Sequence, residues 1–218
     1  MNYKPGNDGF VSLWPTLLLQ QEIPGHEVPN EMLRDLILEL ESSHQALTTD
    51  YLEQDFLQNA HPSVKWLLQC FHVSVKQYMQ KQGVDYDTQW SLQAWPNINR
   101  LGDYHGLHNH PHSYLSGTYY IAVPGQNISS NNRKDLAPGE ISFYDPRAQA
   151  NMTAIKNDPQ IEAEYSVLPK PGTLLLWPAW LHHFVHPNFS DKPRISVSFN
   201  VVLKRSDDYL PTQSLTQS

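Results

Sequence analysis

Residues 194–201 of the expected strand 194–203 alternate strictly between polar and apolar side chains. The apolar positions are Ile195, Val197, Phe199 and Val201, and the polar positions are Arg194, Ser196, Ser198 and Asn200. Because successive side chains of a β-strand point to opposite faces, this strand has one apolar and one polar face. The apolar face is expected to pack on helices or on another sheet. The polar face, which includes a charge, is either an exposed sheet surface or the lining of a polar cavity in a barrel.

A change of sequence pattern at Gly83 separates a helical region from a β-rich region. Before it, apolar residues recur at helical spacing in two segments, one with Asn30 as its expected N-cap and one opening after Pro62. Ahead of both, residues 11–23 are expected to form a strand or an extended segment broken by Pro15. The apolar stripes of both helices should pack against the core.

After Gly83 the chain consists of short segments rich in β-branched and aromatic residues, punctuated by glycine and proline. The expected strands are residues 90–101, 105–110, 115–123, 139–144, 163–168, 172–178 and 194–203. They predict a mainly β fold, a double-stranded β-helix (jelly roll) with N-terminal flanking helices. One structural domain is expected, with an N-terminal strand and helical support region at 1–90, a jelly-roll catalytic core at 91–204 and a flexible tail at 205–218.

The charge and hydropathy of the sequence argue against nucleic acid and membranes as binding partners. The net charge of −7 is spread thinly, and no cluster of Lys and Arg indicates a nucleic-acid interface. No apolar run has the length of a membrane span, and the N-terminus lacks the pattern of a secretion signal. A cytoplasmic protein that binds neither nucleic acid nor membrane is therefore expected. The single cysteine, Cys70, is expected to be a small buried residue, and the oligomeric state is not specified.

Histidines are concentrated in two short windows. Of 11 histidines, those at 105–112 and 182–186 include His108 and His110, which a strand would place on one face, about 7 Å apart. A third ligand would come from the second window, where His183 is preferred because of its spacing to Arg194. His182, His186, Asp103 and Asp145 are weaker candidates. The pair alone is a weak signal, but with a remote histidine it indicates a metal site.

A second element of the pattern is the Arg-x-Ser sequence at Arg194 and Ser196, and ten residues separate His183 from Arg194. Arginine presents a planar fork that binds a carboxylate through two bonds, and a nearby hydroxyl can add another. A metal with open positions beside a buried carboxylate receptor is what 2-oxoglutarate requires. Asn97, on a strand face shared with Trp95, could also contact such a co-substrate or have a structural role.

Several short motifs occur together in the β-rich region. They are Gly102-x-Tyr104-x3-His108-x-His110, Ser116-Gly117-Thr118-Tyr119-Tyr120, Pro171-Gly172, Trp177-Pro178-x-Trp180-x2-His183, Arg194-Ile195-Ser196 and Ser198-Phe199-Asn200. Over residues 95–203 the chain resembles the 2-oxoglutarate/Fe(II) oxygenase family common in marine bacteria and phages, relatives of the prolyl hydroxylases. The resemblance implies a dioxygenase that couples decarboxylation of 2-oxoglutarate, with O2, to hydroxylation of a second substrate.

The resemblance also implies roles for individual residues. His108 and His183 take the positions of metal ligands, Arg194 and Ser196 those that hold the far carboxylate of the co-substrate, and Tyr120 that of a tyrosine touching the same carboxylate. The larger superfamily has Asp or Glu two residues after the first histidine, where this chain has His110. The expected metal set is therefore three histidines around Fe(II).

Two alternatives follow from the three-histidine set. One is a metalloenzyme that does not use 2-oxoglutarate, either a cupin-like dioxygenase or a zinc enzyme. The other is a barrel that binds a metal or ligand without catalysis. The second substrate, a small molecule or a peptide side chain, is not specified, and the polar loops at 124–138 and 146–162 are expected to shape its pocket.

Overall fold

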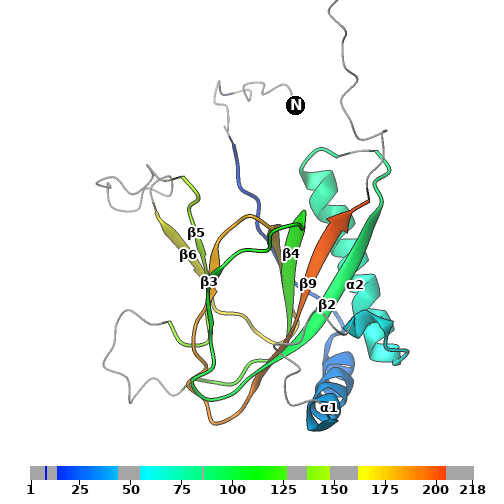
Figure 1. Ribbon diagram of the computed structural model, residues 1–218, viewed down its shortest axis with the longest axis vertical. Helices are drawn as coiled ribbons and strands as arrows, with labels where there is room; N and C mark the ends of the chain where they lie inside the picture. Colours follow the sequence, from blue (N-terminus) through cyan, green and yellow to red (C-terminus); the bar gives the residue numbers. More distant parts are fainter. Residues whose placement is uncertain are drawn as a thin grey trace, which may run out of the picture.

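Two antiparallel β-sheets face each other, and two helices cover the outer face of the larger sheet (Figure 1). The computed structural model describes residue 8 and residues 14–43, 55–84, 86–126, 137–147 and 162–204. The five-stranded major sheet has the order β1-β7-β4-β9-β2, and the four-stranded minor sheet the order β3-β8-β5-β6. This is the expected double-stranded β-helix with N-terminal helices.

The elements follow one another along the chain as β1 (Leu19–Glu22), α1 (Glu27–Ser43), a 3₁₀ turn (Phe56–Gln58), α2 (Pro62–Lys81), β2 (Trp90–Asn99), β3 (His105–His108), β4 (Leu115–Ala122), β5 (Ile141–Tyr144), β6 (Glu164–Val167), β7 (Thr173–Pro178), β8 (His183–Val185) and β9 (Arg194–Leu203). No helix in the described ranges combines the length and apolar character needed to cross a membrane.

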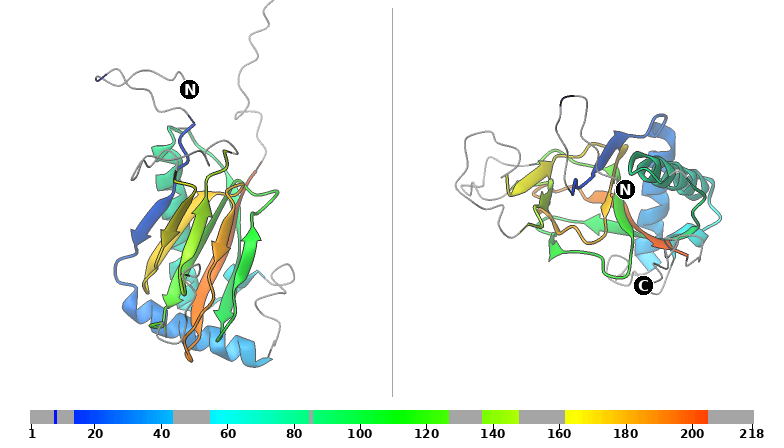
Figure 2. Two further views of the ribbon diagram at one scale, coloured as in Figure 1. Left: turned by 90° about the vertical axis from the view of Figure 1, so that its left-hand side faces the viewer. Right: turned by 90° about the horizontal axis from the view of Figure 1, so that it is seen from above.

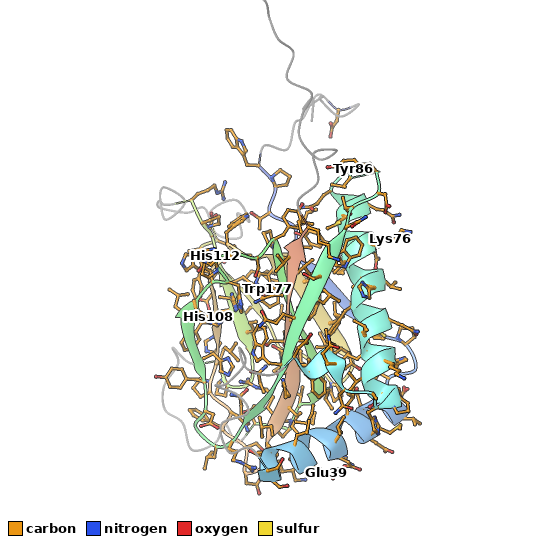
Figure 3. The ribbon with its side chains drawn as sticks, turned by 45° about the vertical axis from the view of Figure 1, so that its right-hand side comes forward. Glu39, Lys76, Tyr86, His108, His112 and Trp177 are labelled. Carbon is orange, nitrogen blue, oxygen red and sulfur yellow. The ribbon has the colours of Figure 1, made fainter. Side chains whose placement is uncertain are left out.

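The apolar face of β9 packs on the helices, as the alternation predicts. Its four expected core residues are all buried, in one cluster with Leu33 of α1 and Leu67 of α2. At the centre of this contact the rings of Phe71 and Phe199 stack, with centroids 3.9 Å apart. The helices and the histidine region therefore lie on opposite faces of the major sheet. Figure 3 shows Lys76 and Glu39 on the helices, across this sheet from His108 and the Trp177 side chain.

Gly117 in β4 is required by this packing. It pairs with Phe199 across the sheet, and a Cβ atom at Gly117 would lie 2.5 Å from the Phe199 ring and 2.7 Å from the carbonyl oxygen of Leu175. The aromatic ring therefore lies directly over the glycine, where any larger residue would collide with it. The contact fixes the position of β9 relative to β4.

The start of α1 differs from the expectation. The helix begins at Glu27, so Asn30 lies in its first turn and is not its N-cap. Asn30 is buried, and its side-chain oxygen accepts a hydrogen bond of 2.7 Å from the Tyr119 hydroxyl of β4. The asparagine thus has a tertiary partner, which sequence propensity does not register. Pro29 is tolerated in the first turn because backbone N–H groups there have no acceptor within the helix. The N–H that proline lacks would therefore not have formed a helical hydrogen bond.

All seven expected strands are present. The strand at 194–203 has the expected bounds and the other six are shorter than expected, and β8 was not expected because it has only three residues. The strand expected at 105–110 ends at His108, before the turn in which His112 has a positive φ of 70°. Of the segment expected at 11–23, the strand covers Leu19–Glu22, which pairs with β7. The tail at 205–218 and most of the two polar loops lie outside the described residues.

Candidate metal and co-substrate site

A cavity of about 480 Å³ lies between the sheets, lined by the polar faces of β2, β4 and β9 and by residues of β3 and β8. One end is closed: Asn99 and Arg194, cross-strand partners on β2 and β9, are buried. Burial decreases along both strands toward Gln93 and Asn200, which are only partly buried. The cavity therefore deepens from the Gln93 end toward Arg194, along strands that run roughly vertically in the left view of Figure 2.

Three histidines meet on the minor-sheet side of this cavity. His108 ends β3 and is the cross-strand partner of His183, which begins β8. His110 follows β3 and is held by its backbone N–H, which donates to the carbonyl of Ala179 at 2.9 Å. One nitrogen from each of the three rings lies within 4.8 Å of the other two. Such a spacing allows a single metal ion to bind all three.

The hydrogen bonds of the rings leave nitrogens available on the cavity side. Nδ1 of His108 lies 2.6 Å from the Gly106 carbonyl oxygen, and Nδ1 of His183 lies 3.1 Å from that of Leu181. When each Nδ1–H donates to its carbonyl, the lone pair remains on Nε2, the atom that would bind a metal.

Burial and the neighbouring imidazoles hold two of these rings neutral. Burial, with the charges of the other histidines, lowers the pKa of His110 to about 4. Burial lowers the pKa of His183 to about 2, and His108 contributes in the same direction. Metal ligands must be deprotonated, so the folded chain presents these two side chains in their binding form at neutral pH.

The weaker ligand candidates do not join this cluster. His182 is exposed. His186 is buried, but its Nε2 lies 2.8 Å from the Ser142 hydroxyl. Asp103 accepts a bond of 2.8 Å from the backbone N–H of Arg100, and Asp145 pairs with Arg147. Among the described residues, a carboxylate ligand therefore does not complete the histidine set.

Arg194 is completely buried at the closed end of the cavity. One terminal nitrogen donates to the His186 carbonyl at 3.1 Å and the other approaches the Asn99 side-chain oxygen at 3.4 Å. Its Nε has no partner, and no carboxylate forms an ion pair with it, within the described part of the chain. A buried guanidinium without a counter-charge is costly, so this end of the cavity favours an anion.

The other predicted co-substrate residues lie next to Arg194. Asn97, Ser196 and Tyr120 are cross-strand neighbours on β2, β9 and β4, and all three line the cavity. Burial raises the pKa of Tyr120 to about 12, against the opposing effect of Arg194, so its hydroxyl stays protonated and can donate. The Asn97 amide donates to the Ser198 hydroxyl at 2.9 Å, while its oxygen has no partner among the described residues.

Two hydrogen-bond acceptors of Arg194, the Asn99 side chain and the His186 carbonyl, were not predicted from the sequence. Asn99 connects Arg194 to His105, whose Nε2 lies 3.1 Å from the Asn99 amide nitrogen. Asn99 shares a strand face with Asn97, and that periodicity could have identified it. The contact with His186 uses a backbone carbonyl, which carries no sequence signal.

The sequence matches a family profile described as "Putative 2OG-Fe(II) oxygenase" over residues 93–200. The chain belongs to this family. It is therefore an enzyme of the 2OG-Fe(II) oxygenases, with Fe(II) and 2-oxoglutarate as its cofactors. The matched range holds the histidine cluster and Arg194, so the family assignment and the cavity concern the same part of the chain. No curated protein matches the sequence.

Solved structures of other oxygenases share the fold at low sequence identity. A Pseudomonas putida prolyl-4-hydroxylase is 14% identical, covering 86% of this chain and 88% of its own, with a TM-score of 0.54. A Trichoplax adhaerens prolyl hydroxylase, in complex with a hypoxia inducible factor peptide fragment, is 12% identical, covering 85% and 83%, with a TM-score of 0.57. HygX from Streptomyces hygroscopicus, with nickel and 2-oxoglutarate bound, is 14% identical, covering 86% and 82%, with a TM-score of 0.52.

The residues present fit both family cofactors. Three clustered imidazole nitrogens suit a divalent first-row metal such as Fe(II), with positions left for other ligands. The unpartnered Nε of Arg194 and the protonated Tyr120 hydroxyl suit the far carboxylate of a dicarboxylic acid.

Proposed function

We propose that this oxygenase hydroxylates a small molecule or a peptide side chain, with conversion of 2-oxoglutarate and O2 to succinate and CO2. His108, His110 and His183 would hold Fe(II), and Arg194, Ser196, Tyr120 and Asn97 would bind 2-oxoglutarate. The observation that carries the proposal is the buried guanidinium of Arg194, without a carboxylate partner among the described residues, in the same cavity as the histidine cluster.

Distances along β9 support a co-substrate that reaches from Arg194 to the metal. Trp95, the cross-strand partner of Ser198, has its ring 6.0 Å from the His110 ring. Ser198 follows Arg194 by four residues, which is about 13 Å of strand. The long arginine side chain takes up part of this span, and a five-carbon dicarboxylate suits the remainder.

The side chains of this chain have separate tasks in the proposed reaction. The Arg194 guanidinium and the Tyr120 hydroxyl hold the far carboxylate, so that the 2-oxo acid end is aimed at the histidines. The rings of Trp95 and Trp177, which lie 6.0 Å from His110 and 4.9 Å from His183, keep water from this region. When bound, Fe(II) and 2-oxoglutarate supply the oxidising chemistry.

Replacing a carboxylate ligand by His110 changes the charge at the site. Three neutral imidazoles leave a divalent metal with its full charge of two, where two histidines and a carboxylate would leave one. Attraction to the dianionic co-substrate should be stronger as a result.

The test is an anaerobic titration of 2-oxoglutarate into Fe(II)-loaded protein, followed through the metal-to-ligand charge-transfer band. Arg194→Leu should weaken 2-oxoglutarate binding by roughly 2–5 kcal/mol, the range for truncating one partner of a buried charge pair, and leave iron binding nearly intact. Arg194→Lys should recover only part of the loss, because the two-pronged contact is gone.

Arg100→Leu is the matched control, because Arg100 is exposed, pairs with Glu41 and is not one of the residues that line the cavity. It should bind 2-oxoglutarate like the wild type. If the wild type does not bind the co-substrate, or if Arg194→Leu binds it equally well, the proposal fails and a three-histidine metalloenzyme independent of 2-oxoglutarate takes its place.

A further inference from the structure

A row of four polar side chains crosses the major sheet near the open end of the cavity. The cross-strand register pairs Trp177 of β7 with Ser116 of β4, Ser116 with Asn200 of β9, and Asn200 with Gln93 of β2. All four residues line the cavity. The row lies six residues beyond Arg194 along β9, so it is separate from the co-substrate residues and adjoins the histidines through Trp177.

Two atoms of this row have unused hydrogen-bonding capacity. The Asn200 side-chain oxygen and the Trp177 indole nitrogen are buried, and neither has a partner among the described residues. The first is an acceptor and the second can only donate. Buried polar atoms are nearly always paired, so a complementary molecule with one donor and one acceptor is implied.

The charge of the lining restricts the chemistry of that molecule. Among the described residues that line the cavity, Arg194 at the closed end is the only Asp, Glu, Lys or Arg. The open half instead presents carboxamides, hydroxyls and indole rings, from Gln93, Asn109, Ser113, Ser116, Asn200 and Trp177. A charged group buried against these side chains would lose its hydration without gaining a counter-charge from any of them.

From these observations we infer that the row Trp177–Ser116–Asn200–Gln93 is the subsite for the primary substrate, and that the substrate part bound there is uncharged. It carries a donor, an amide N–H or a hydroxyl, for Asn200 Oδ1, and an acceptor oxygen for Trp177 Nε1. Asn200 is thus a specificity-determining residue that selects neutral over charged substrates. The inference rests on the proposed function and deepens it.

The test measures binding without turnover. Full-length protein loaded with Fe(II) and 2-oxoglutarate under anaerobic conditions is titrated with matched small probes, and binding is followed by saturation-transfer NMR. The probes are N-acetylglycinamide (a neutral amide), N-acetylglycine (an anion), glycinamide (a cation) and glycerol (a neutral polyol). N-acetylglycinamide or glycerol should bind at least tenfold more tightly than either charged probe, and comparison of the two separates amide from hydroxyl recognition.

A near-isosteric substitution reverses the expected selectivity. Asn200→Asp keeps the acceptor oxygen and adds a negative charge, so glycinamide should become the preferred probe. Gln93→Glu, at the more open end of the same row, should shift the preference in the same direction. Gln77→Glu is the control, since Gln77 is an exposed residue of α2, which covers the face of the major sheet away from the cavity, so it adds the same charge outside the cavity.

The outcomes separate the inference from the proposed function. If the charge-transfer band reports normal 2-oxoglutarate binding but neutral probes do not bind, or bind no better than charged ones, the subsite assignment is overturned. It is also overturned if both Asn200→Asp and Gln93→Glu keep the wild-type order of probes while binding 2-oxoglutarate. Absence of 2-oxoglutarate binding in the wild type contradicts the proposed function instead.

Discussion

Three histidines within five residues have three different environments. His182 is exposed, His183 lies in the cavity cluster, and His186 is buried against Ser142. The period of two in a strand separates the first two, because adjacent side chains point to opposite faces. The short strand β8 therefore selects one imidazole from a histidine-rich sequence, and its neighbours serve as internal controls for the metal assignment.

His183→Ala should lose metal affinity by more than about 100-fold, because removing only an outer partner of a ligand already costs about 10–100-fold. His182→Ala should bind metal like the wild type, and His186→Ala should largely keep it while losing the contact with Ser142. Isothermal titration with a divalent metal under anaerobic conditions measures all three. Equal loss in His186→Ala and His183→Ala would contradict the ligand assignment.

At the scale of elements, the contact between β4 and β9 joins the core to the cavity. One face of β9 carries Phe199, which stacks on Phe71 of α2, and the other carries Ser198 and Asn200. Displacement of this strand by helix packing would move both the co-substrate residues and the proposed substrate row. Gly117 determines how closely β4 can approach β9, so it affects the site through packing.

Gly117→Ala should lower the free energy of unfolding by about 1–3 kcal/mol, the usual cost of overpacking a filled core. The added methyl group would meet the Phe199 ring and the Leu175 carbonyl oxygen, and the latter belongs to the backbone and cannot rotate away. Gly106→Ala in β3 is the matched control, because a Cβ there has nothing within 4 Å. Urea unfolding followed by circular dichroism compares them, and equal midpoints would refute the packing argument.

The same elements show how far the sequence predicts the structure. The eight-residue alternation at 194–201 identified both faces of β9, because a long regular pattern leaves one interpretation. The three residues of β8 are too few to have a period, and the contact of Asn30 with Tyr119 depends on two segments 89 residues apart. Clustering in the sequence identified the histidines. The hydrogen bonds of Arg194 to Asn99 and to the His186 carbonyl could not be predicted, because they form only when distant segments of the chain meet at the same end of the cavity.

At the scale of the whole molecule, the buried imidazoles make stability depend on pH. Burial is the main cause that lowers the pKa of His105 and His110 to about 4, from an ordinary value of 6.5. Below pH 6.5 the unfolded chain binds protons at these positions while the folded chain does not. Stability is therefore fully present above about pH 6.5 and decreases as the pH falls toward about 4.

Chelator-treated protein should accordingly unfold at progressively lower temperature between pH 7 and pH 4.5, as measured by differential scanning calorimetry. His110→Gln, which cannot be protonated, should show a shallower decline over the same range. Identical slopes for the wild type and the variant would show that this imidazole does not contribute to the acid sensitivity.

The closed end of the barrel determines the order in which ligands bind and leave. A co-substrate bound at Arg194 lies behind the row formed by Trp177, Ser116, Asn200 and Gln93, so a substrate on that row stands between it and the open end. Molecules in such a blind passage must enter in one order and leave in the reverse. We therefore expect 2-oxoglutarate to bind first, and the succinate made from it to stay trapped until the hydroxylated product has departed.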